Sequence, residues 1–145
     1  MIRPFSIEDL SRILQIEHQS FPKSPYDWAT FIHLHTLYPE TFLVYVETLS
    51  KAKREEILGY IVFSKDGHII SIAIDPKHRR RGIGKKLVEE VLKSPWIKRV
   101  WAEVRRSNHG AQNFYLRMGF QIIGEVPNYY GNEDALVVQW FPSPS

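Results

Sequence analysis

The sequence contains no cysteine and no long apolar run, and each absence excludes a class of protein or site. Without cysteine the chain has no disulfides, no thiolate metal ligands and no cysteine nucleophile. No apolar stretch approaches the roughly 18 to 20 residues that a membrane-spanning helix needs, and the N-terminus lacks the pattern of a signal peptide. We therefore expect a cytoplasmic protein that does not interact with a membrane.

The sequence also has little net charge, because 19 lysines and arginines face 16 aspartates and glutamates for a balance of +3. A strong general nucleic-acid binder usually carries a larger excess of positive charge. The basic character is instead local, with six lysines and arginines between positions 77 and 86. His33 and His35 are two positions apart on an expected helix and point in different directions, so no metal site is expected.

The apolar pattern predicts strands at 1–5, 42–47, 57–64, 68–74, 99–104, 120–124 and 135–141, and helices at 7–17, 27–37, 82–94 and 108–118. This order, β-α-α-β-β-β-α-β-α-β-β, predicts one α/β domain over residues 1–145 with a mixed, mostly antiparallel central sheet flanked by helices. Residues 50–56 are expected to form an exposed connection and residues 142–145 a frayed tail. Asn108 is a predicted helix N-cap, and Gly119 follows a helix at the C′ position.

Residues 69–86, IISIAIDPKHRRRGIGKK, carry the most specific local signal. A predicted strand is followed by Arg79-x-x-Gly82-x-Gly84 and then by a predicted helix. A glycine-containing turn at a helix start presents main-chain N–H groups and the positive end of the helix dipole to a phosphate. The P-loop and dinucleotide patterns are absent. A solvated basic face or a nucleic-acid patch is the alternative, but the glycine spacing favours a phosphorylated ligand.

Three segments resemble the GNAT acetyltransferases. Arg79-x-x-Gly82-x-Gly84 is similar to the Gln/Arg-x-x-Gly-x-Gly/Ala loop that binds the acyl-CoA pyrophosphate in that family. Two further segments resemble segments of the GNAT branch that acetylates protein N-termini, which includes the ribosomal-protein-alanine acetyltransferases. They are WAEVRRSNHGAQNFYLRMGF at 101–120 and NYYGNEDA at 128–135. The likeness covers nearly the whole chain, and it implies the fold of that family.

The resemblance implies acetyl-CoA as the acetyl donor. Main-chain groups of Ile72, Ala73 and Ile74 would pair with the pantetheine amides, and an N–H near Ile74 would polarise the thioester carbonyl and stabilise the oxyanion. Asn108 would contact the pantetheine arm. The pyrophosphate would lie on the turn and helix start formed by Arg79, Arg80, Arg81, Gly82, Ile83, Gly84 and Lys85.

Glu103 and Tyr115 are the expected catalytic residues. Strand alternation places Glu103 with Trp101 and Arg105, on the face opposite Val100, Ala102 and Val104. An isolated strand glutamate is usually solvated or paired, here with Arg105, and a tyrosine beside a phenylalanine usually packs its helix on the sheet. The resemblance instead makes Glu103 the general base, directly or through water, and places the Tyr115 hydroxyl near the CoA sulfur.

The substrate residues follow from the same resemblance. Tyr129 and Tyr130 lie between the last two strands and would contact the peptide backbone, and Phe21, Pro22 and Tyr26 would form the opposite wall. The chain departs from the family here, because it has Pro22-Lys-Ser-Pro-Tyr-Asp-Trp28 where many relatives have Pro-Trp-Ser. The preferred N-terminal residues therefore do not follow from the sequence.

The expected reaction is acetyl transfer from acetyl-CoA to a primary amine by direct attack in a ternary complex, and the expected acceptor is a protein α-amino group. An α-amine with a pKa near 8 is partly neutral at pH 7, whereas lysine with a pKa near 10.4 is almost fully charged. Two alternatives stay open: a lysine or small-amine acetyltransferase, and a nucleic-acid-binding module that uses Arg79–Arg81. The sequence does not decide whether a partner subunit is needed.

Overall fold

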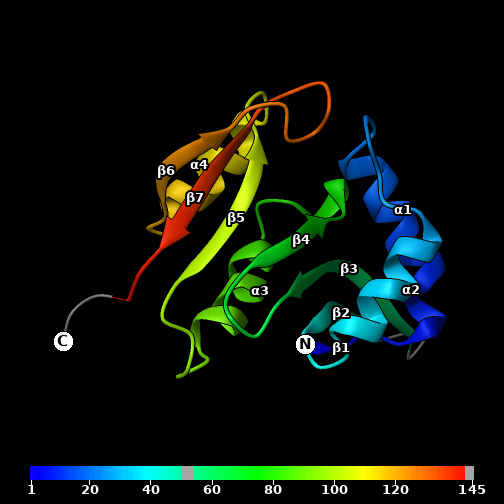
Figure 1. Cartoon of the computed structure of the whole chain (residues 1–145). Helices are drawn as coiled ribbons and strands as arrows, with labels where there is room; N and C mark the ends of the chain where they lie inside the picture. The colour runs from blue at the N-terminus through cyan, green and yellow to red at the C-terminus, as the bar shows by residue number, and fades with distance from the viewer. Residues whose placement is uncertain (50–53, 143–145) are drawn as a thin grey trace.

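The computed structural model describes residues 1–49 and 54–142, without the side chain of Leu49 (Figure 1). The predicted order of elements is confirmed. The strands are β1 (Ile2–Pro4), β2 (Phe42–Leu49), β3 (Arg54–Phe63), β4 (Ile69–Ile74), β5 (Val100–Arg105), β6 (Gln121–Val126) and β7 (Ala135–Trp140). The helices are η1 (Ile7–Asp9), α1 (Leu10–Ser20), α2 (Trp28–Leu37), η2 (Pro76–His78), α3 (Ile83–Leu92) and α4 (His109–Arg117), where η marks a single 3₁₀ turn. Most of the predicted C-terminal tail, residues 143–145, lies outside the described residues.

The β2–β3 hairpin is longer than the sequence predicted. Residues 50–56 were expected as an exposed connection, but Glu47 pairs with Glu56, Thr48 with Glu55 and Leu49 with Arg54. The ladder here extends beyond the core, where Arg54 and Glu55 are exposed. No apolar alternation marks a strand that buries neither face, so the sequence pattern missed it. Residues 50–53 of that expected connection lie outside the described part of the chain.

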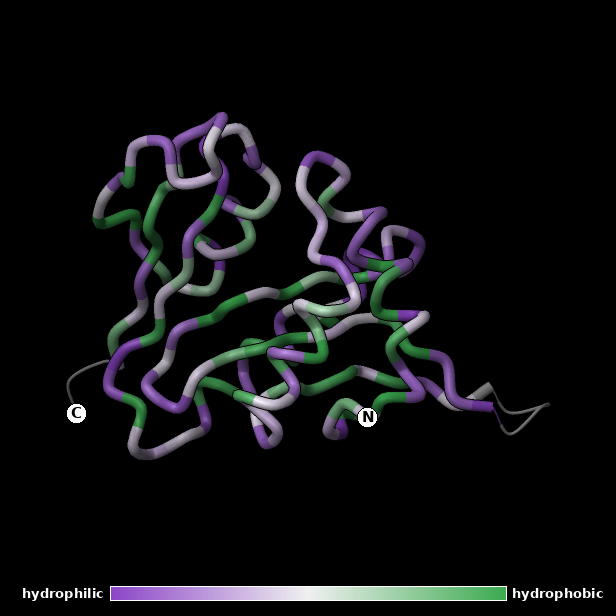
Figure 2. The backbone as a smooth tube through the Cα atoms, turned by 45° about the vertical axis from the view of Figure 1, so that its right-hand side comes forward, coloured by the Kyte–Doolittle hydropathy of each residue, from purple (hydrophilic) through white to green (hydrophobic). Residues whose placement is uncertain are grey.

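The strands form two antiparallel sheets, β1-β2-β3-β4 and β5-β7-β6. Their parallel contact among the described residues is an isolated bridge between His68 and Trp101, where the Trp101 N–H donates to the Gly67 carbonyl at 3.0 Å. β4 and β5 lie side by side at this bridge and then diverge (Figures 1 and 2). The sequence predicted one mixed, mostly antiparallel central sheet. In the structure this sheet is split into two antiparallel sheets that meet at the His68–Trp101 bridge.

Two local features determine where the two sheets separate. Gly67 has φ +103°, and a Cβ there would lie 2.0 Å from the Arg99 carbonyl oxygen, so the close approach of the two segments requires glycine. In the β3–β4 ladder, Val62 pairs with Ser71 and Phe63 pairs with Ile69. Ile70 is therefore an extra residue of β4, at a β-bulge. Bulges increase strand twist. The two sheets thus diverge directly after the bridge.

Helices cover both faces of the first sheet. α1 and α2 pack on one face, in a cluster that includes Ile13, Phe31 and Tyr60, all fully buried. α3 packs on the other face through residues such as Leu87, in a second cluster that continues across β5 to Tyr115 of α4. This second cluster contains buried residues of both sheets and so joins them. Figure 1 shows how the two sheets are inclined to each other. None of the helices within the described residues is long and apolar enough to cross a membrane.

Candidate active site

The edge of β4 that faces β5 is open beyond the bridge, since no strand of the described chain pairs with it there. The Asp75 N–H donates to the Leu58 carbonyl at 2.8 Å, which sets the alternation along β4. Ile72 and Ile74 therefore direct their main-chain groups to the open edge. Ala73, predicted together with them, directs its main-chain groups to β3 instead. An extended ligand that carries amide groups can pair with this edge.

The segment from β4 to α3 begins at a buried aspartate. The Asp75 carboxylate accepts the N–H of Lys77 at 3.0 Å and forms an ion pair with Arg12 of α1. Burial raises the pKa of Asp75, but the hydrogen bonds from Lys77 and Arg12 outweigh it and hold the pKa below its ordinary value. The carboxylate therefore stays ionised and anchors the start of this segment to α1.

The same segment presents main-chain donors at the start of α3. Arg80 (φ 66°) and Gly82 (φ 78°) are both left-handed, and Gly82 is the N-cap of α3. Nothing lies within 4 Å of a Cβ built on Gly82, so its backbone conformation rather than the available space favours glycine. The first N–H groups of a helix have no intrahelical partner, and the helix dipole adds positive potential. This helix start offers the donors and the positive potential that an anion needs, and the binding of a diphosphate there stays a prediction.

The side chains around this helix start differ in their availability. Arg81 forms an ion pair with Glu47 of β2. The Ile83 side chain is buried in the core, so only its main-chain N–H is available to a ligand. The other cationic residues of the prediction have exposed side chains: Arg79, Arg80 and Lys85.

Gly84 lies where α3 meets α4. A Cβ at Gly84 would lie 3.0 Å from Cε1 of Phe114 and 3.8 Å from Cγ1 of Ile74, so glycine permits close packing beside the open edge of β4. Asn108 begins α4, and its Oδ1 accepts the Ala111 N–H at 3.0 Å, which confirms the predicted cap. The contact between Asn108 and a pantetheine arm stays a prediction.

Glu103 lies on the face of β5 opposite its buried valines, as alternation predicted. Its carboxylate oxygens are 2.9 and 2.8 Å from Nε2 of His68, and the Tyr129 hydroxyl donates to Oε1 at 3.4 Å. The Glu103 side chain is only 15% exposed. Arg105, the partner considered for Glu103 from the sequence, pairs with Glu133 at 3.1 Å instead. Glu103 is therefore a largely enclosed carboxylate in contact with a histidine and a tyrosine.

His68 was not among the residues predicted for the site. Its ring stacks on the Trp101 indole, with centroids 5.0 Å apart and planes inclined by 1°, and Arg99 lies 4.1 Å from the Trp101 ring centroid. His68 and Glu103 are 35 positions apart, so no local pattern relates them. In the sequence His68 is only the first residue of the predicted strand before the glycine turn, which gives no sign of its partner.

Tyr115 is almost fully buried, and its ring contacts Phe114 and Phe120 with centroids 5.2 and 5.0 Å away. Burial, followed by the nearby Tyr130 and Glu103, raises the pKa of Tyr115 well above its ordinary value. The hydroxyl stays protonated at neutral pH and can act as a donor. Tyr115 thus packs α4 against the second sheet, which is the structural role considered from the sequence. Its protonated hydroxyl is also compatible with the catalytic role.

Tyr129 and Tyr130 lie in the loop of residues 127–134 between β6 and β7. Their rings meet edge to face with centroids 4.9 Å apart. Burial and the Glu103 charge raise the pKa of Tyr129, and burial together with Tyr129 raises the pKa of Tyr130 to about 12. Both phenols are therefore hydrogen-bond donors at neutral pH, and the Tyr129 hydroxyl already contacts the Glu103 carboxylate.

The loop of residues 21–27 between α1 and α2 is held by Glu17. The Glu17 carbonyl accepts the Phe21 N–H at 2.8 Å, and its carboxylate accepts the Tyr26 N–H at 2.9 Å and the Tyr60 hydroxyl. Burial raises the pKa of Glu17, although both hydrogen bonds to its carboxylate oppose the shift. From the sequence, Glu17 was placed only in the periodic pattern of the first helix, with no role of its own. Its contacts with both ends of the loop are visible in the structure alone.

The residues predicted for the acceptor wall sit on this loop in different environments. Phe21 and Tyr26 are partly buried against the α1–α2 core, whereas Pro22 is exposed. Burial, followed by the charges of Glu17 and Glu103, raises the pKa of Tyr26. Tyr26 therefore lies close enough to Glu103 to be affected by its charge, although the two residues are far apart in the sequence.

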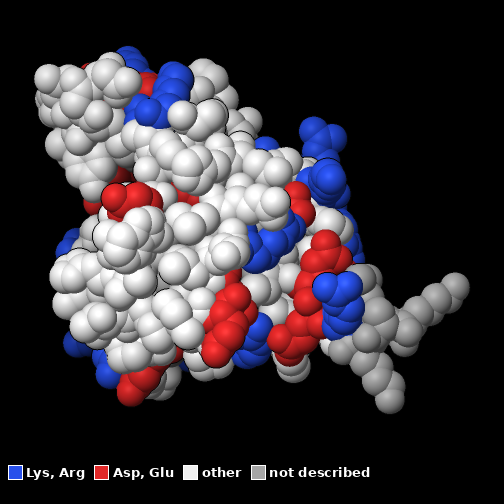
Figure 3. Space-filling view, turned by 90° about the vertical axis from the view of Figure 1, so that its right-hand side faces the viewer, with Lys and Arg blue, Asp and Glu red and all other residues white. Residues whose placement is uncertain are grey.

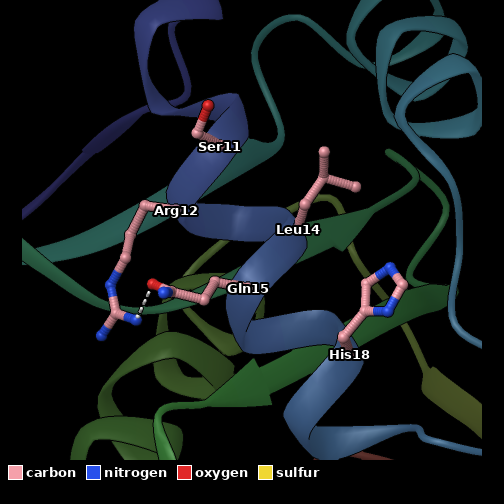
Figure 4. A pocket seen from close by; sticks show the side chains of 5 residues that line it. All are labelled: Ser11, Arg12, Leu14, Gln15 and His18. Carbon is pink, nitrogen blue, oxygen red and sulfur yellow. Dashed lines mark hydrogen bonds between the residues drawn. The ribbon is translucent and has the colours of Figure 1, made fainter.

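A shallow surface hollow of about 480 Å³ lies apart from these residues. Figure 4 shows the side chains that line it: Ser11, Arg12, Leu14, Gln15 and His18. All come from the outer face of α1. Seen from the α1 and α2 side, acidic and basic side chains are interspersed on the surface (Figure 3). We assign no chemistry to this hollow, because one helix face lines it and no carboxylate is among its residues.

The chain is similar to known proteins over most of its length. Residues 7–120 match the Acetyltransferase (GNAT) family. An uncharacterised N-acetyltransferase of Methanocaldococcus jannaschii is 35% identical over 95% of this chain and 89% of its own length. A putative ribosomal-protein-bS18-alanine N-acetyltransferase of Bacillus subtilis is 32% identical over 94% of this chain and 92% of its own length.

A solved structure gives the same result. The crystal structure of Ard1 from Thermoplasma volcanium matches with a TM-score of 0.79 and 29% identity, over 99% of this chain and 98% of that chain. The predicted fold class is therefore confirmed, and so is the enzyme class implied by the three motifs. The chain belongs to the GNAT acetyltransferase family and is an N-acetyltransferase.

Proposed function

We propose that this enzyme transfers the acetyl group of acetyl-CoA to the α-amino group of a protein N-terminus. The position of Glu103 carries the proposal. This enclosed carboxylate contacts His68 and Tyr129 at the place where β4 and β5 diverge, beside the open edge of β4. A carboxylate in that position can accept a proton from an amine that enters between the two tyrosine-bearing loops.

The residues along this edge fit acetyl-CoA, the acetyl donor of GNAT enzymes. Ile72 and Ile74 offer main-chain amides to an extended, amide-containing arm, and the start of α3 offers N–H donors to a diphosphate. Arg79 and Arg80 add positive charge beside that helix start. When bound, acetyl-CoA supplies the acetyl group as a thioester.

The remaining roles follow from the environments of three side chains. Glu103 accepts the ammonium proton of the acceptor, directly or through water. His68 Nε2 lies 2.8 Å from that carboxylate, and since its side chain is 30% exposed it offers the proton a path to solvent. Tyr115 remains protonated and donates a hydrogen bond to the departing sulfur. A thiolate is a fair leaving group, so this last contribution is the smallest.

Two observations favour a protein N-terminus as the acceptor. Tyr129 and Tyr130 on one loop, and Phe21, Pro22 and Tyr26 on the other, provide hydroxyl and apolar contacts for an extended peptide. The relative from Bacillus subtilis is described as acting on an alanine of a ribosomal protein, and the likeness to this chain covers nearly its full length.

Three acceptors test the proposal: a lysine-free peptide with a free N-terminus, the same peptide with a blocked N-terminus and one lysine, and spermidine. The neutral fraction alone favours the α-amine over lysine by about two-hundredfold at pH 7. We expect kcat/KM for the free N-terminus to exceed the values for the blocked lysine peptide and for spermidine by at least about a hundredfold. A higher value for lysine or spermidine would contradict the N-terminal assignment.

A further inference from the structure

The loop that carries Tyr129 and Tyr130 is fixed by one carboxylate. Glu133 accepts the main-chain N–H of Ser107 at 2.6 Å and the guanidinium of Arg105 at 3.1 Å. Hydrogen bonding from Ser107 and then from Arg105 lowers the pKa of Glu133 to about 2, so this side chain is ionised at neutral pH. Glu133 therefore joins the 127–134 loop to the end of β5.

Arg105 also contacts the opposite loop. Its side chain is only 12% exposed, and Nη2 donates to Oγ of Ser24 in the α1–α2 loop. Nη1 donates to Asn132 Oδ1 at 3.2 Å as well as to Glu133, and the guanidinium lies 4.2 Å from the Tyr130 ring centroid. One guanidinium thus contacts both of the loops that flank Glu103.

We propose that Arg105 and Glu133 are positioning residues that set the separation of the α1–α2 loop and the β6–β7 loop around the acceptor. Through this separation they hold Tyr129 and Tyr130 in place before the acceptor binds. The inference rests on the proposed function, because that function places the acceptor between the two loops.

The chemistry of the pair supports a positioning role. A guanidinium is a rigid planar fork that donates in several directions at once, whereas a lysine ammonium is a compact charge on a flexible chain. Only the fork reaches Ser24 on one side and Glu133 on the other while its face stacks on Tyr130. Loops that are ordered in advance lose less conformational freedom when a peptide binds, so the pair contributes to affinity without touching the reacting atoms.

The pair also explains why two separate sequence segments belong to one site. Arg105 and Ser107 lie in WAEVRRSN, and Glu133 lies in NYYGNEDA, 26 to 28 positions later. The first segment supplies the donors and the second supplies the acceptor. The tyrosines of the second segment are thereby placed beside Glu103 of the first.

Steady-state kinetics on Arg105→Lys and Glu133→Gln test the proposal. Both substitutions conserve size, and Arg105→Lys also conserves charge. We expect the peptide KM to rise about tenfold in each, as for the loss of one charge-assisted contact, with the acetyl-CoA KM unchanged. In the double variant the two effects should not multiply, because both remove the same contact. Ser24→Ala, at an exposed position, should raise the peptide KM by a smaller factor.

A neighbouring residue provides a matched control. Glu125 lies on the outer surface of β6 and pairs there with Arg106, whose side chain is 61% exposed, so Glu125→Gln should leave both KM values unchanged. Thermal unfolding shows whether each variant is folded. If Arg105→Lys or Glu133→Gln does not fold, Ser24→Ala decides, and an unchanged peptide KM in that variant overturns the proposal.

The outcomes separate the two claims. If the native enzyme acetylates peptide N-termini but the folded variants keep the native peptide KM, only the positioning role is wrong. An equal rise in both KM values would show a general structural role and would also overturn the proposal. If the native enzyme acetylates no peptide N-terminus, the proposed function itself fails.

Discussion

Replacing the buried Glu17 tests whether a carboxylate inside the fold shapes the acceptor loop. Glu17 is 2% exposed and receives the Tyr26 N–H and the Tyr60 hydroxyl, and Tyr60 lies 2.7 Å from Ser71 Oγ. In Glu17→Gln the amide oxygen can accept from Tyr26 and the amide nitrogen can donate to Tyr60. The Tyr60 hydroxyl then donates to Ser71, so every polar group keeps a partner.

Glu17→Ala removes both acceptors and leaves a cavity. An unpaired buried donor costs about 1–3 kcal/mol, and the cavity adds to that cost. We therefore expect Glu17→Ala to lower the free energy of unfolding by about 2–4 kcal/mol at pH 5. Glu17→Gln should change it by less than about 1 kcal/mol at the same pH, because no group loses its partner. Urea unfolding of the native protein and both variants measures these values.

The pH dependence of this stability has a defined sign. Burial raises the folded-state pKa of Glu17 above the ordinary value of 4.5, against the opposing hydrogen bonds. Between those two values the folded protein binds more protons than the unfolded chain, so the Glu17 contribution is complete below pH 4.5 and is lost as the pH rises through the folded pKa. The unfolding free energy of the native protein minus that of Glu17→Gln should therefore fall as the pH rises above about 4.5 and through the raised folded-state pKa of Glu17.

Taking this difference cancels groups with the opposite slope, such as Asp75 and Glu133, whose pKa values are lowered in the fold. A difference that stays constant or increases with pH would refute the reasoning about Glu17. Equal stability of Glu17→Ala and Glu17→Gln would refute the hydrogen-bond argument. In kinetics, Glu17→Ala should raise the peptide KM and Glu17→Gln should not, since only the first releases the Tyr26 N–H.

Three further predictions concern the reaction. Glu103→Gln should lower kcat by about a hundredfold or more without changing acetyl-CoA affinity, because it removes the base and keeps the shape. In calorimetry, Gly82→Val should weaken acetyl-CoA binding more than Arg80→Ala, because a branched residue strains the left-handed turn at φ 78° that orients the main-chain donors. Tyr129→Phe should raise the peptide KM similarly for all peptides, whereas Tyr26→Ala should change the preference among peptides that differ in their first residue.

Each of these has a contrary result. Unaltered turnover of Glu103→Gln at pH 7 would make Glu103 a structural residue. A larger loss of affinity from Arg80→Ala than from Gly82→Val would show that side-chain charge dominates the binding of the diphosphate. Tyr129→Phe and Tyr26→Ala variants that shift all peptides equally would remove the distinction between backbone and side-chain contacts.

Local sequence patterns were enough to predict the order of elements, the helix start after the glycine turn and the buried face of β5. These features depend on residues that are close in the chain, where periodicity, capping by Asn108 and the left-handed turn at Gly82 act locally. Motif resemblance added Glu103 and Tyr115. The end of the β2–β3 hairpin was predicted wrongly, because a strand that extends past the core has no apolar alternation.

The contacts of each site residue, in contrast, depend on how distant segments pack together. Glu103 meets His68 rather than Arg105 because the His68–Trp101 bridge brings the two sheets together, across 35 positions of sequence between His68 and Glu103. Arg105 is then free to pair with Glu133, and Glu17 reaches into the core to hold the loop that follows its own helix. Charge pairing and burial depend on distances in space, and no pattern of neighbouring residues carries those distances.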